Sequence, residues 1–93
     1  MRIPSGSTYT DSTKIDDRPG FYYVSIIDGN RFALLAGPYT SHGEALDMVR
    51  TAKDIAYLAN PTQCAFAGFG TCRLESSAGL GTLHKLGIMS EPR

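Results

Sequence analysis

The feature that most constrains the fold is a turn signal between two apolar runs. "FYYVSII" covers residues 21–27, "FALLAG" covers residues 32–37, and Asp28, Gly29 and Asn30 stand between them. Aromatic and β-branched residues favour strands, and Asp, Asn and Gly tolerate the positive φ angles of a tight type I′ turn. The pattern therefore predicts an antiparallel β-hairpin. Its two-residue loop is either Asp28-Gly29 or Gly29-Asn30.

Both faces of this predicted hairpin carry apolar side chains. One face groups Tyr22, Val24, Ile26, Ala33 and Leu35, and the other groups Tyr23, Ser25, Ile27, Phe32 and Leu34. A strand pair that is apolar on both sides is usually covered on both sides, whereas a half-exposed sheet alternates apolar and polar residues. We therefore expect something to pack against each face.

A helix is predicted over residues 41–59. Ser41 followed by Glu44 fits a capping box, and Asn60-Pro61 ends the helix because the residue before proline avoids the α region. Apolar residues recur between these ends at spacings of three and four, namely Ala45, Met48, Val49, Ala52, Ile55, Ala56 and Ala59. This stripe is typical of an amphipathic helix of about eighteen residues that packs on a sheet.

The last strand signal, "QCAFAGFGTCRLE" over residues 63–75, has two interpretations. A single strand would run through it, whereas a hairpin turning about Gly68 would bring Cys64 opposite Cys72, close enough for a disulfide. We favour one strand, because "AGFG" lacks an Asn-Gly or Asp-Gly turn signal. Two cysteines are too few for a disulfide scaffold, so we expect thiols in a reducing compartment, although a cystine would overturn the single strand.

These elements predict an α+β fold with the order β-β-α-β. A right-handed crossover makes the third strand parallel to the second, and the first strand lies between them, which gives a three-stranded sheet of order 2-1-3 with the helix on one face. Residues 1–20, rich in Ser, Thr, Asp, Gly and Pro, are expected to be a flexible leader. Residues 21–75 form the single domain. Residues 76–93 are a tail. Its "LHKLGIM" segment either docks on the sheet face opposite the helix, which we call the second face, or leaves that face exposed.

Charge and hydropathy exclude several classes of protein. The nine basic and nine acidic residues give a net charge of zero and form no long run of either sign, so neither a basic nucleic-acid groove nor an acidic mimic of DNA is indicated. The first twenty residues lack the apolar region of a secretory signal, and no apolar run approaches the ~20 residues that span a bilayer. We therefore expect a cytoplasmic protein.

No residue pattern predicts catalysis, a metal or a cofactor. His42 and His84 belong to different predicted segments, and nothing places either beside Cys64 or Cys72 for nucleophilic chemistry. The chain contains neither a Cys-x2-Cys nor a His-x3-His pair, and "GFGTCR" lacks the Walker lysine and precedes no helix. We expect a non-enzymatic protein without a cofactor.

The second face of the sheet is therefore the predicted working surface. Its candidate residues are Tyr23, Ile27, Arg31, Phe32, Leu34, Phe66, Phe69 and Arg73. An uncovered apolar face of this kind usually binds a partner or a second copy of the same chain. The alternative is a nucleic-acid-binding accessory protein that stacks bases on these aromatics and contacts phosphates through Arg31 and Arg73.

A resemblance extends over residues 21–75. The runs "FYYVSIIDG", "LLAGPYTSHGEALDMVRTAKDIA" and "FGTCRLE" resemble small single-domain proteins encoded on bacterial plasmids, integrative elements and prophages, most specifically in the Gly-Pro-aromatic corner before the Glu-Ala-Leu helix start. The resemblance implies a phage or other mobile-element origin and brings no catalytic residues. We therefore expect an interaction module that forms a homodimer or binds a host protein through the sheet face and an edge strand, with host regulation or inhibition of a defence protein as its role.

Overall fold

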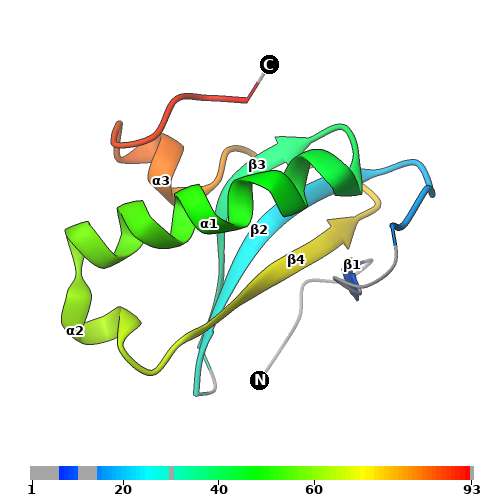
Figure 1. Cartoon of the computed structure of the whole chain (residues 1–93). Coiled ribbons are helices and arrows are strands. Elements are labelled where there is room, and N and C mark those ends of the chain that lie inside the picture. The colour runs from blue at the N-terminus through cyan, green and yellow to red at the C-terminus, as the bar shows by residue number, and fades with distance from the viewer. Residues whose placement is uncertain (1–6, 11–14, 30, 93) are drawn as a thin grey trace.

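The computed structural model describes residues 7–10, 15–29 and 31–92 (Figure 1). Its elements are β1 (Ser7–Thr10), β2 (Phe21–Asp28), β3 (Arg31–Tyr39), α1 (His42–Ala59), α2 (Pro61–Cys64), β4 (Gly68–Leu74) and α3 (Thr82–Lys85). The strands form one sheet of order β1-β4-β2-β3, in which all neighbours are antiparallel. The α+β class is therefore confirmed.

The three predicted strands take the predicted order. β2 lies between β3 and β4 and is antiparallel to both, so β3 and β4 run parallel to each other, as the crossover rule requires. Asp28 pairs with Arg31 in the hairpin, which selects the Gly29-Asn30 loop, and Gly29 has a φ of 61°. Asn30 itself lies outside the described residues.

The last strand is single but shorter than expected. The chain from Pro61 to Cys64 forms the short helix α2, and β4 begins only at Gly68. Cys64 and Cys72 are both buried free thiols, so the disulfide-bridged hairpin is excluded. The helix follows because the Cys64 amide donates to the Asn60 carbonyl at 3.2 Å and Pro61 suits a first helical position.

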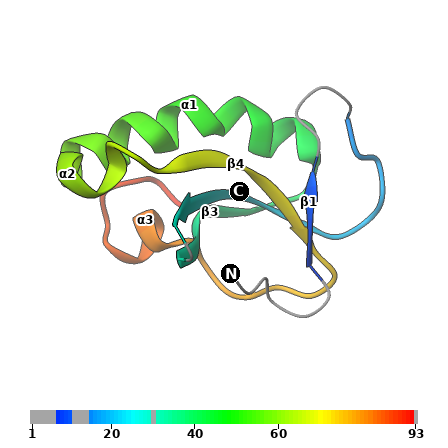
Figure 2. The ribbon, with the colours of Figure 1, turned by 90° about the horizontal axis from the view of Figure 1, so that it is seen from below.

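The predicted amphipathic helix is confirmed, with eighteen residues in α1. The Ser41 hydroxyl accepts a hydrogen bond from the Glu44 amide at 3.2 Å, while the Glu44 carboxylate accepts one from the Thr40 hydroxyl at 2.7 Å. α1 lies along one face of the sheet (Figure 2). The buried residues of this core are Tyr22, Val24, Leu35, Ala36, Tyr39, Ala45, Ala52, Ala56, Cys64, Leu83 and Met89. Alanines on the stripe let the helix approach the strands closely.

The sequence predicted a flexible leader over residues 1–20. For residues 7–10 and 15–20, which the structure describes, this prediction is wrong. Residues 7–10 form the edge strand β1, paired with β4 from Ser7–Leu74 to Thr10–Thr71. This pairing joins segments some sixty residues apart, and short polar strands carry no periodicity that would reveal them. The sheet therefore has a fourth strand that the sequence pattern does not show.

Residues 15–20 are held against the core by hydrogen bonds. The Asp16 amide donates to Nδ1 of His42 at 2.7 Å, and the Tyr22 hydroxyl donates to the Arg18 carbonyl at 2.6 Å. His42 is fully buried and stacks on the Tyr22 ring, with 5.7 Å between centroids. This segment is therefore part of the folded domain.

The tail packs against the rest of the domain, mainly at the β3 edge of the sheet. Near its start, the Ala78 amide donates to the Tyr23 hydroxyl at 3.1 Å, and that hydroxyl donates to the Gly79 carbonyl at 2.7 Å. This contact covers part of the second face. Figures 1 and 2 show the chain then reaching α3, which lies beyond β3.

The edge of β3 is closed at Gly37. The Gly37 amide donates to Nε2 of His84 at 2.9 Å, and the Gly37 carbonyl accepts from the Gly81 amide at 3.0 Å. A Cβ atom at Gly81 would come within 2.5 Å of the Ala36 backbone, so only glycine fits this approach. Leu83 and Met89 then join the core beside α1. The "LHKLGIM" segment is thus a structural part of the domain.

Candidate functional site

The second face of the sheet is less open than the sequence suggested. Tyr23 has no exposed surface and packs with Cys72 and Leu74, while Phe32 and Leu34 are partly buried against this group. Ile27 is half-buried between its cross-strand partners on β3 and β4. Tyr23 therefore cannot contact a partner in this conformation.

Two other predicted residues lie on the helix side of the sheet. Phe69 packs against Tyr57 of α1, with 6.1 Å between ring centroids, and Lys53 lies with Nζ 5.8 Å from the Phe69 centroid. Arg73 donates from Nε to the Pro19 carbonyl at 2.9 Å. Neither side chain belongs to the face that carries Tyr23, so the predicted set is divided between the two faces.

Exposed apolar side chains gather instead at one end of the molecule. Leu58, Phe66, Leu86 and Ile88 are exposed by 87%, 92%, 64% and 43%, and we call these four residues the apolar end. They belong to the end of α1, the turn between α2 and β4, and the segment after α3. Figure 1 places these three segments on the same side of the molecule. Leu58 lies outside the apolar stripe of α1. This position in the sequence could have identified Leu58 as an exposed apolar residue.

Three depressions are relevant to this end of the molecule, and Leu58, Leu86 and Ile88 help to line two of them. The first, of about 340 Å³, lies between α1, α2, α3 and the strands, and its lining residues are Ile26, Ala33, Leu35, Ala56, Ala59, Asn60, Cys64, Thr82, Leu83 and Leu86. The second, of about 320 Å³, is lined by Ile55, Leu58, Ala59 and Ile88. The third, of about 370 Å³, is lined by Ile26, Asp28, Arg31, Phe32 and Ala33. The first depression shares Ile26 and Ala33 with the third and Ala59 with the second, so the first lies next to each of the other two.

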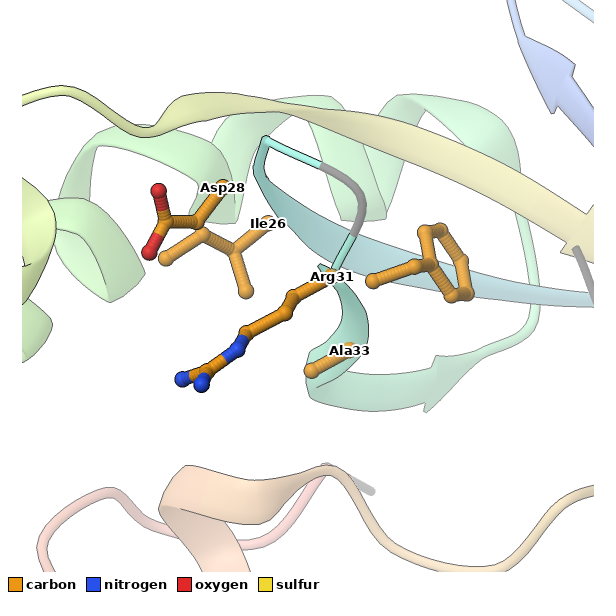
Figure 3. Close-up of a pocket in the computed structure, with 5 residues that line it drawn as sticks. Ile26, Asp28, Arg31 and Ala33 are labelled. Carbon is orange, nitrogen blue, oxygen red and sulfur yellow. The ribbon is translucent and has the colours of Figure 1, made fainter. Parts of the chain in front are cut away.

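The third depression carries two charges of opposite sign. Asp28 and Arg31 face each other across the hairpin register and project from it toward the same side (Figure 3). The ion pair found in the described part of the chain joins Arg18 to Asp16 at 2.5 Å, and it does not involve this depression. The Asp28 carboxylate and the Arg31 guanidinium are therefore available to a partner. Of the predicted candidates, Arg31 and Phe32 line this depression, and Phe66 belongs to the apolar end.

Cys72, His42 and His84 could suggest catalysis, but all three are buried within the fold. Burial raises the pKa of the Cys72 thiol to about 12, so this thiol is neutral at physiological pH and a poor nucleophile. His42 lies 3.2 Å from the Thr71 hydroxyl through Nε2, and His84 lies 3.3 Å from the Met89 carbonyl through Nδ1. Residues 7–10, 15–29 and 31–92 contain no cluster of His, Cys, Asp and Glu side chains that could hold a metal ion.

Comparison with known proteins provides no relative. No family model, curated protein or solved structure matches the chain. Among the described residues, no helix has the length and apolar character needed to cross a membrane.

Proposed function

We propose that this chain is a non-enzymatic protein-interaction module that binds its partner through the apolar end. The observation that supports this proposal most directly is the exposure of Leu58, Phe66, Leu86 and Ile88 at one end of the molecule, where Leu58, Leu86 and Ile88 help to line two depressions. Large apolar side chains gathered around a hollowed surface are typical of protein–protein interfaces, whereas isolated exposed leucines are common on any protein.

The apolar end provides more apolar surface for a partner to bury than the second face of the sheet does. Fully burying one Leu, Ile or Phe side chain contributes about 1.5–3 kcal/mol, so four of them provide a substantial driving force even after the cost of association. On the second face, Tyr23 is already buried and the tail covers its hydroxyl. We therefore place the interaction surface at the apolar end and not on the sheet face; of the residues expected from the sequence it includes Phe66, while Arg31 and Phe32 line the 370 Å³ depression.

The resemblance to small proteins of plasmids, integrative elements and prophages supports a search among host proteins. A host regulator or defence protein is the class of partner that this resemblance favours, beside a second copy of the chain. The arrangement does not favour nucleic-acid binding, because two of the residues expected to contact bases and phosphates are engaged within the fold: Phe69 packs against Tyr57, and Arg73 donates to the Pro19 carbonyl.

The test compares two variants with the wild type. In L58S/L86S, two exposed side chains of the apolar end become polar; in the control I15S, a side chain that is 60% exposed elsewhere is changed in the same way. Tagged proteins are used to capture partners from nuclease-treated and untreated bacterial lysate, and self-association is measured by light scattering. We expect association that survives nuclease treatment and I15S but is lost in L58S/L86S. Association that L58S/L86S retains, or that nuclease abolishes, would contradict the proposal.

A further inference from the structure

We infer that the apolar end pairs with a second copy of this chain around a two-fold axis. Phe66 of each copy enters the 340 Å³ depression of the other, and Asp28 of each copy contacts Arg31 of the other. This inference rests on the proposed function and names its partner.

The Phe66 ring is suited to insert into the depression of a second copy. Phe66 is 92% exposed and follows α2 in the short turn before β4, so the described part of the chain leaves its ring open to a partner. The depression of about 340 Å³ is lined almost entirely by apolar side chains. A cavity of about 150 Å³ is large enough to bind benzene, so a phenyl ring fits the available volume.

The inserting side chain and the depression are close neighbours. Cys64 lines the depression and precedes Phe66 by two residues, and α2 forms part of the same wall. In a two-fold interface the same patch on each copy must be complementary to itself. A patch that holds a protruding ring beside an apolar hollow meets this condition, because rotation places each ring against the other copy's hollow.

The charges favour a second copy over a foreign peptide. Asp28 and Arg31 are cross-strand neighbours that line the 370 Å³ depression next to the one that Phe66 enters, and a two-fold axis that passes between them places each against its opposite in the other copy. An acidic segment would be attracted by Arg31 and repelled by Asp28. A basic segment would be attracted by Asp28 and repelled by Arg31. The second copy matches both charges at once.

The first experiment measures the oligomeric state of the whole chain. Sedimentation equilibrium from about 1 µM to about 500 µM is expected to show a monomer–dimer equilibrium. F66S should raise the dimer dissociation constant by about a hundredfold or more, because two phenyl rings lose their burial. I15S should leave it unchanged. Since Phe66 is almost fully exposed, F66S should keep the circular dichroism spectrum and the urea midpoint of the monomer.

The second experiment exchanges the charges. R31E places a second carboxylate against Asp28 of the other copy, and D28R places two guanidinium groups together, so each variant alone should dimerise at least tenfold more weakly. An equimolar mixture of the two should form a heterodimer, because both contacts again join opposite charges. The double variant D28R/R31E should recover the homodimer. A merely structural role for either residue would not be rescued by mixing.

The outcomes distinguish this inference from the proposed function. A wild-type chain that stays monomeric up to about 500 µM overturns the dimer. A dimer that F66S leaves intact, or single charge variants that mixing fails to rescue, overturns this interface. In each of these cases capture of a host protein that depends on Leu58 and Leu86 would still support the proposed function. Loss of that capture as well would overturn both.

Discussion

At the scale of the residue, His42 joins three segments of the chain. Its Nδ1 accepts from the Asp16 amide, its Nε2 lies 3.2 Å from the Thr71 hydroxyl, and its ring stacks on Tyr22. Because Nδ1 accepts, Nε2 carries the proton and donates to Thr71. The sequence pattern identified His42 only as a residue of the first helical turn. Its partners lie 26 and 29 residues away, so no local spacing reveals them.

We predict that H42F lowers the free energy of unfolding by about 1–3 kcal/mol, because the partly buried Asp16 amide loses its acceptor. Phenylalanine keeps the ring stacked on Tyr22, so the loss reports on hydrogen bonding rather than on an empty space. Urea unfolding measures the stability. Hydrogen exchange of the Asp16 amide should accelerate more than that of amides in β2, and unchanged protection of that amide would contradict this role of His42.

Asp16 predicts a dependence of stability on pH. The Arg18 side chain and its backbone amide donate to the Asp16 carboxylate and hold the pKa of Asp16 below its usual 3.8. The charged form is therefore favoured by the folded state, so its stabilising contribution is complete above about pH 4 and is lost as the pH falls toward the lowered pKa. We predict that the difference in stability between wild type and D16N is constant from pH 7 to pH 5 and shrinks in stronger acid. Thermal unfolding of both chains measures it; a difference that does not change down to pH 2 would exclude this linkage.

At the scale of the element, the segment around α3 belongs to the core although the sequence marks it as a tail. Leu83 is 3% exposed and packs with the α1 face of the sheet, whereas Leu86 is 64% exposed three residues later. The two leucines therefore form a matched pair for asking how firmly this segment is bound.

We predict that L83A lowers the free energy of unfolding by about 2–5 kcal/mol, because it removes a buried side chain from a packed core. L86A should change it by no more than about 0.5 kcal/mol. Urea unfolding at low micromolar protein, where self-association contributes little, measures both. Equal effects of the two substitutions would mean that the segment does not pack as described.

The elements that could be predicted are those whose signals are local. The Asp28-Gly29-Asn30 turn predicted the hairpin, and Ser41, Glu44 and Pro61 predicted both ends of α1. The sheet order followed from the crossover rule applied to those elements. β1 could not be predicted, and docking of the tail was only one of two alternatives, because both depend on hydrogen bonds between distant segments. The apolar end was missed for a related reason: Leu58, Phe66 and Leu86 come together only in the folded chain.

At the scale of the whole molecule, apolar exposure is unevenly distributed. The chain has a radius of gyration of 12.1 Å, and four of the six large hydrophobic residues that are well exposed in its described part lie at the apolar end. The sequence indicated a binding surface but placed it on the sheet, since strand alternation shows which residues share a face and does not show which face the tail covers.

We predict that the thermal midpoint of the wild type rises as the protein concentration increases from about 5 µM to about 500 µM, because dimerisation stabilises the folded state by mass action. F66S should show a midpoint that does not depend on concentration. Differential scanning calorimetry of both proteins measures this, and parallel behaviour of wild type and F66S would contradict the assigned interface.

The position of β1 has a consequence for how the protein forms during its synthesis. Its neighbour in the sheet is β4, which ends at Leu74, so β1 leaves the ribosome long before its pairing strand exists. The β2–β3 hairpin and α1 can form from local contacts as they emerge, whereas both pairings of β4 must wait for most of the chain. β1 therefore docks only after β4 has been made, later than the β2–β3 hairpin and α1 can form.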